Sequence, residues 1–344
     1  MTPIGQVYRP EGRVDARSIL SATILGVATA LLAAIVVWAW ELSPIPTLVI
    51  ITPLAQGFVI GGVLAWLIGR LKLRHPKLMA TVGLACGLAS VGLIHYAHYL
   101  HFLDEVRTQA RAMVEASDEI PAARKPEVLA KLAADKGAVG DEFLTDQTGH
   151  PGLVGSLIFQ AKQGIRIKSA ELTGWGVYIL WACEAGAVAV VAAAMASKRA
   201  AMPYCEDCGT WCARAMSPVV LGGEATGDFA DALRTDDPQR AAHLIEQPTD
   251  ADALEQHRAR AILHSCPDCD QTFGDVEAHQ TRIKKGKAEV TTSLVLRKVR
   301  LSPAMTGLLR EPIAGADDSG RPEDDVAAAP LVADEAGPLD ARES

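Results

Sequence analysis

The sequence predicts an α-helical membrane bundle of four transmembrane helices, followed by a small cytoplasmic α+β domain. Three observations support this fold class. Four long apolar runs interrupt the chain of 344 residues, Lys and Arg gather in the links on one side of these runs, and five of the seven cysteines lie in the polar region after the last run. Hydrophobicity, charge and cysteine spacing therefore point to the same architecture.

Each apolar run is long enough to cross a bilayer as a helix, which takes about 20 consecutive apolar residues. The runs that meet this length are Ile19–Trp40, Pro46–Gly69, Leu78–Leu100 and Leu172–Met195. The first run lacks a small-residue cleavage site, so we expect it to remain as a span rather than to be removed as a signal peptide.

The short links predict the orientation, because an excess of Lys and Arg stays on the cytoplasmic side. Three Arg precede the first span and four basic residues lie in 70–77, whereas Glu41 is the one charge between the first two spans. Lys198 and Arg199 follow the fourth span. We therefore expect a multi-pass protein of the plasma (inner) membrane with both termini in the cytoplasm.

This topology divides the chain into six parts. They are a cytoplasmic N-terminal segment at 1–18, transmembrane helices one to three at 19–100, an external helical loop at 101–171, transmembrane helix four at 172–195, a cytoplasmic domain at 203–301 with a helical insert at 224–264, and a disordered acidic tail at 311–344. The tail holds ten Asp and Glu against two Arg, which accounts for the whole formal net charge of −8. Such a charged, weakly apolar composition is typical of disorder.

The local patterns predict further elements. In the external loop they are helices at Phe102–Ala116 and Pro126–Lys136, a turn at 148–152 and a short stretch at Leu153–Gln163. In the domain they are a helix from Asp237-Pro238 through Glu246, another helix from Thr249 toward His264, and a hairpin of Thr272–Ile283 with Ala288–Leu301. The helix starts are indicated by capping residues and the hairpin by its Val- and Thr-rich runs.

The cysteines after the fourth span form two closely spaced pairs. Two residues separate Cys205 from Cys208, and two separate Cys266 from Cys269. Thiolates at this spacing reach one metal ion from a tight turn, and two such turns complete a tetrahedral shell of four sulfurs. Cys212 is a fifth thiol beside the first pair, and its roles remain open between a spare or alternative ligand, a reactive thiol and a small half-buried residue.

At these cysteines the sequence resembles the zinc-ribbon and rubredoxin-like group of knuckle proteins, over roughly residues 203–300. In that group four thiolates hold zinc, or iron in the rubredoxins, and three strands surround the site. The resemblance implies that the ligands are Cys205, Cys208, Cys266 and Cys269. Zinc is the expected metal and iron the alternative, because Asp270 replaces the Gly usual after the second pair and 57 residues separate the pairs. The whole layout resembles bacterial multi-pass membrane proteins with a C-terminal zinc ribbon.

Glu184 is a carboxylate near the middle of the fourth span, where an ionised group costs several kcal/mol unless it is paired or protonated. Gln56 lies at a similar expected depth on the second span. One interpretation is a proton or ion site between helices. The other, which we favour because the spans hold no second acid or basic partner, is a protonated Glu184 bonded to Gln56 or to a backbone carbonyl.

Two further patterns in the spans have alternative interpretations. His95, His98 and His101 follow one another at the outer end of span three, and water-facing histidines are favoured over a metal site because no third ligand is evident. The motifs Gly57-x-x-x-Gly61 and Gly83-x-x-x-Gly87 offer small faces for close helix contacts.

Three classes of function stay open on this sequence. The leading one is a membrane-anchored structural zinc module without catalysis, an interaction or regulatory protein whose partners are the lipid bilayer and a cytoplasmic protein. The alternatives are a membrane-bound thiol redox or electron-transfer protein that uses the cysteine pairs, and a small transporter-like protein around Glu184. The basic hairpin favours a solvated face, lipid or protein over nucleic acid, because Phe273 is the one aromatic residue available for base stacking.

Overall fold

A computed structural model of the chain describes residues 4–10, 16–41, 51–134, 137–167, 170–247, 257–284 and 287–310. The chain forms two compact units. Among the described residues, the first contains those of Tyr8–Cys212 and Cys266–Cys269, and the second contains those of 4–7, Ala213–Ser265 and 270–310. The predicted domain at 203–301 is therefore divided, because its two cysteine pairs group with the helices and its long strands form the second unit. The acidic tail and residues 46–50 of the second predicted span lie outside the described residues.

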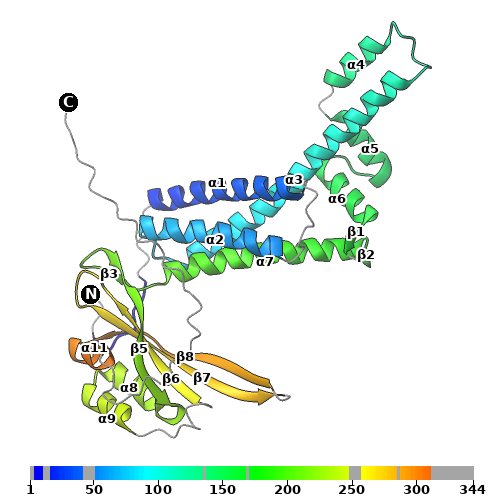
Figure 1. The fold of residues 1–344 in the computed structure, drawn as a ribbon. Coiled ribbons are helices and arrows are strands. Elements are labelled where there is room, and N and C mark those ends of the chain that lie inside the picture. The colour runs from blue at the N-terminus through cyan, green and yellow to red at the C-terminus, as the bar shows by residue number, and fades with distance from the viewer. Residues whose placement is uncertain are drawn as a thin grey trace, which may run out of the picture. The chain divides into compact units, whose positions relative to one another are not determined.

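Four long helices form the bundle of the first unit (Figure 1). They are α1 (Ala16–Glu41), α2 (Ile51–Leu71), α3 (Pro76–Ala116) and α7 (Trp175–Ala200). All four are long and apolar enough to cross a membrane, which confirms the four predicted apolar helices. Large apolar side chains such as Leu32, Val36 and Ile179 are exposed on them, as expected for helices whose outer surface meets lipid rather than water.

The glycine motifs bring α2 and α3 close to α7. A Cβ atom added at Gly87 would lie 2.6 Å from the Cα of Ala189, and one added at Gly83 would lie 2.8 Å from the carbonyl oxygen of Ala192. Gly57 on α2 is similarly close to the α7 backbone. Only residues without a side chain allow this approach, so both motifs mark helix contacts inside one chain.

The segment between α3 and α7 is mostly helical. It contains α4 (Lys125–Ala134), α5 (Ala138–Thr148), α6 (Gly152–Gln163) and a two-stranded hairpin of β1 (Ile165–Ile167) and β2 (Ala170–Leu172). The predicted helix at Phe102–Ala116 is present, but it continues α3 without a break. Leu172, the predicted start of the fourth span, pairs instead with Ile165 in the hairpin, and the helix begins at Trp175.

The second unit is an antiparallel sheet with short helices (Figure 1). Its strands lie in the order β5 (Ala213–Gly222), β6 (His257–Ser265), β7 (Thr272–Lys284) and β8 (Lys287–Leu301). The helices are α8 (Thr226–Thr235), α9 (Pro238–Glu246) and α11 (Pro303–Arg310), and a 3-10 turn, Gly223–Ala225, precedes α8. Phe229 and Leu233 of α8 are buried with Leu263, Val276 and Val299 of the sheet in one apolar core.

The structure confirms the hairpin and one of the two predicted helices of this region. The Asp237 side chain caps α9 by accepting a hydrogen bond from the backbone N–H of Arg240 at 3.0 Å. The helix expected to run toward His264 is wrong over 257–264, because these residues form β6 between two partner strands. Residues 261–264 are all buried, as expected of a central strand that has a partner on each side. Residues 248–256, where that helix was expected to begin, lie outside the described residues.

Candidate metal centre

The two predicted cysteine pairs come together in the first unit. Ligand atoms of Cys205, Cys208, Cys266 and Cys269 all lie within 4.8 Å of one another. The Sγ atoms of Cys205 and Cys269 are 3.6 Å apart. Four sulfurs at a metal–sulfur distance of about 2.3 Å in a tetrahedron would be separated by about 3.8 Å. The cluster therefore has the dimensions to hold one metal ion.

A short antiparallel strand pair builds the first knuckle. Strand β3 (Tyr204–Cys205) pairs with β4 (Thr210–Trp211), so that Cys205 lies opposite Thr210. The turn between them closes through a hydrogen bond from the Gly209 N–H to the Cys205 carbonyl at 2.9 Å. Gly209 has a φ of 70°, a conformation that a residue with a Cβ adopts only with strain. The glycine therefore allows both cysteines of the pair to face the same point.

The four thiols differ in their acidity. Burial, together with a hydrogen bond to Cys269, raises the pKa of Cys205. A hydrogen bond to Cys269 is the main cause that raises the pKa of Cys208. Burial also acts to raise the pKa of Cys266, but hydrogen bonds with the Thr210 hydroxyl and with the backbone near Asp268 outweigh it and lower that pKa to about 7. A divalent cation would favour thiolates at all four positions and displace the remaining protons.

Cys212 lies beside the cluster but does not belong to it. Its side chain is buried, and its backbone N–H donates a hydrogen bond to the Pro203 carbonyl at 3.0 Å. Burial and the neighbouring thiolates raise the pKa of Cys212 to about 12. A buried, protonated thiol has little nucleophilic character. These contacts describe a small residue packed behind the first knuckle.

Trp211 links the first knuckle to the ends of α2 and α7. Its indole Nε1–H donates a hydrogen bond to the carbonyl of Gly69 on α2 at 3.0 Å. The guanidinium of Arg199 on α7 lies 4.9 Å from the centre of its ring, a cation–π contact. Trp211 also packs against the buried core of the bundle. Trp211 thus contacts residues near the ends of both α2 and α7.

Arg74, in the link between α2 and α3, makes two contacts with the same knuckle. It forms an ion pair with Glu206, which lies between the cysteines of the first pair. Its guanidinium also lies 4.7 Å from the centre of the Tyr204 ring. The sequence marked Arg74 only as an orientation signal, because its partner Glu206 is 132 residues away and no local pattern connects them.

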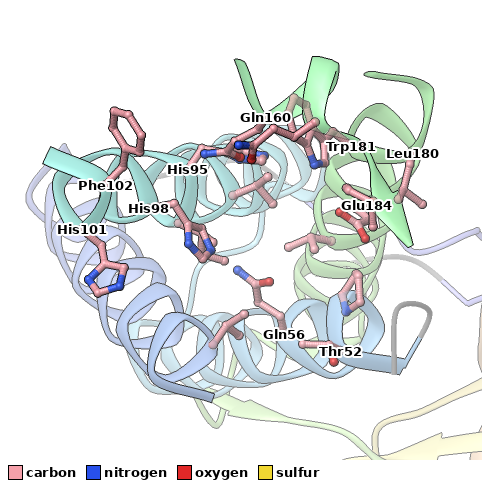
Figure 2. Close-up of a pocket in the computed structure, with 18 of the residues that line it drawn as sticks. Thr52, Gln56, His95, His98, His101, Phe102, Gln160, Leu180, Trp181 and Glu184 are labelled. Carbon is pink, nitrogen blue, oxygen red and sulfur yellow. The ribbon is translucent and has the colours of Figure 1, made fainter. Parts of the chain in front are cut away.

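The remaining candidates, Gln56 and Glu184, are separate from the cysteines. Both line a cavity of about 530 Å³ in the helical bundle, together with His95, His98 and His101 (Figure 2). The buried Gln56 amide donates a hydrogen bond to the Ser90 hydroxyl at 2.6 Å, and that hydroxyl donates to the Ala30 carbonyl at 2.9 Å. The sequence connects Gln56 with Glu184 by their expected depth and indicates the histidines separately, whereas in the structure all of them line one cavity.

Comparison with known proteins found no relative of this chain. No family model matches the chain, and no match is found among curated proteins or among solved structures. The chemistry of the cysteine cluster must therefore be inferred from its own residues and contacts.

Proposed function

We propose that this protein is a membrane-anchored structural zinc module without catalysis. In this proposal, one zinc ion bound by the four cysteines fixes the conformation of the first knuckle. Contacts from this knuckle then stabilise the ends of the membrane helices α2 and α7. The observation that carries the proposal is the placement of Trp211 and Arg74, which connect the knuckle to α2, α7 and the α2–α3 link.

The donor set favours zinc in a structural role. Zinc prefers a tetrahedral shell, and four cysteine thiolates fill it without leaving a position for water or substrate. A closed site of this kind stabilises the fold directly, since its ligands converge only in the folded chain. Iron in the same shell is the alternative, and it would add electron transfer.

The proposed orientation has both termini and the cysteine cluster in the cytoplasm. The basic link at 70–77 and the knuckle contact each other, so they lie on one side of the bilayer, and the excess of Lys and Arg in that link favours the cytoplasmic side. Reducing conditions there keep thiols available for metal. We propose that the second unit, with the sheet of β5 to β8, binds a cytoplasmic protein partner.

Metal analysis of the purified full-length protein tests the proposal. We expect about one zinc per chain, in line with one four-sulfur site, and we expect Cys266→Ser to abolish it. Cys212→Ser is the matched control, because Cys212 is a neighbouring buried thiol outside the cluster, and this variant should keep its zinc. Protein without metal that carries a reducible Cys205–Cys208 disulfide would contradict the zinc module and favour the redox alternative. Iron in place of zinc would favour electron transfer.

A further inference from the structure

The cavity in the helical bundle lies apart from the cysteine cluster and has a mixed lining. Residues of α1, α2, α3, α6 and α7 enclose its volume of about 530 Å³. Figure 2 shows the side chains of Gln56, His98 and Glu184 pointing into this space. Cavities of roughly 300–1,000 Å³ with apolar walls and a few convergent polar groups are typical of small-molecule sites.

The fixed charges on the lining of the cavity are negative. Glu184 and Glu105 contribute carboxylates, three histidines contribute imidazoles, and the described lining includes no Lys or Arg. Glu184 lies nine residues after the start of α7, or about 14 Å along the helix. An ionised carboxylate at such a depth would attract a cation strongly, because the surrounding dielectric constant is low. A bound cation would therefore favour the ionised form of Glu184 over the protonated form expected without a ligand. An anionic ligand would find no fixed countercharge here.

The geometry of the lining disfavours a bare metal ion. Among the described residues, the only group of His, Cys, Asp and Glu with ligand atoms close enough for one metal is the cysteine cluster. In the described part of the chain, no three of the cavity's imidazoles and carboxylates therefore converge on a common centre. A larger ligand, which meets these groups at separate points, fits their spacing better.

Aromatic side chains line the cavity beside the carboxylate. Trp181 lies one turn before Glu184 on α7, and its ring meets the His95 ring edge-on at 4.9 Å. Phe102 also lines the space. Aromatic faces attract organic cations within about 6 Å, and Val91 and Leu180 supply apolar contact for the body of a ligand.

We infer that this cavity binds an organic cation, an amine or quaternary ammonium group on an aromatic or aliphatic body. Glu184 supplies the countercharge, Trp181 contacts the body, and Gln56 with His98 offers polar contacts. This site is distinct from the zinc module and does not depend on it.

Binding of ethidium, a fluorescent aromatic cation, to the full-length protein in lipid nanodiscs tests the inference by fluorescence anisotropy. We expect saturable binding with one site per chain, and we expect Glu184→Gln to weaken it about tenfold or more, because the charge interaction is lost. Glu142→Gln changes an exposed carboxylate on α5 outside the cavity and should bind as the wild type does. Anilinonaphthalene sulfonate, an aromatic anion, should not displace ethidium.

A second pair of variants keeps the test decisive if Glu184→Gln fails to fold, which a shifted thermal unfolding midpoint or an aggregated size-exclusion profile would reveal. Trp181→Leu removes an aromatic wall of the cavity and should weaken ethidium binding. Trp175→Leu changes a Trp that is 81% exposed and should not. The inference is overturned if the wild type binds no ethidium saturably, if a folded Glu184→Gln protein binds it as tightly as the wild type, if Trp181→Leu and Trp175→Leu bind alike, or if the anion competes for the site.

Discussion

The indole N–H of Trp211 donates a hydrogen bond to the carbonyl of Gly69, 142 residues earlier in the chain. The carbonyl belongs to a membrane helix, and the indole belongs to a strand of the cysteine knuckle. If a metal ion orders the knuckle, as we propose, this bond would extend its stabilising effect to the end of α2. Loss of the metal should therefore loosen the helix ends as well as the knuckle.

Trp211→Phe should make the knuckle release its metal faster. The substitution keeps an aromatic ring near Arg199 but removes the hydrogen bond to Gly69, at a cost of about 1 kcal/mol. The measurement is the rate of zinc transfer to an excess of chelator, together with the thermal unfolding midpoint. Trp175→Phe, at an exposed position, should leave both unchanged. Equal rates of zinc release from the two variants would contradict a role of the Trp211–Gly69 hydrogen bond in stabilising the knuckle.

Arg74 and Glu206 should be energetically coupled. A double-mutant cycle with Arg74→Gln and Glu206→Gln should give a coupling of about 0.5–1 kcal/mol, because the Arg74 side chain is only 13% exposed while Glu206 is 46% exposed. The cycle is measured by chemical or thermal unfolding of the zinc-loaded protein. The exposed pair of Arg107 and Asp104 should show a smaller coupling. A coupling energy no larger than in that control pair would contradict the proposed role of Arg74 in connecting the knuckle to the α2–α3 link.

Gly87→Val should disrupt the packing of α3 against α7. The new Cβ would meet the Ala189 backbone at 2.6 Å, so the helices must separate, at a cost of about 1–3 kcal/mol. Gly92→Val on the same helix is the control, because a Cβ there meets nothing within 4 Å. Thermal unfolding in detergent should show a lower midpoint for Gly87→Val only. Similar midpoints for both variants would contradict the assigned helix contact.

Metal affinity should fall as the pH falls. The raised pKa values of Cys205 and Cys208 keep both thiols protonated at neutral pH without metal, so metal binding must displace their protons. Cys266, with a pKa lowered to about 7, adds a further proton only below about pH 7. The two protons displaced from Cys205 and Cys208 alone imply at least about a hundredfold change in affinity per pH unit, and the dependence should steepen below neutral pH. Competition with a chelator at several pH values measures this slope, and a flat profile would contradict thiolate ligation.

Features set by local patterns were predictable from the sequence. The four apolar helices follow from hydrophobicity, and the hairpin of β7 and β8 follows from its composition. The cysteine cluster was predictable because each pair needs only a tight turn, and Gly209 supplies one of them.

Features set by distant contacts were not predictable. A helix was expected from Thr249 toward His264 because residues 249–252 resemble a capping box, but over 257–264 the strands on both sides impose an extended conformation. The contacts of Arg74 and Trp211 likewise join parts of the chain more than 130 residues apart. The cavity around Glu184 draws on five helices, and no single helical pattern reveals it.

X-ray absorption at the zinc edge of the full-length protein tests the central claim most directly. The account predicts four sulfur neighbours at about 2.3 Å and no nitrogen or oxygen ligand. The same spectrum should be obtained from Cys212→Ser, since that thiol lies outside the cluster. A shell with fewer than four sulfurs, or one completed by nitrogen or oxygen, would contradict a closed structural site at Cys205, Cys208, Cys266 and Cys269.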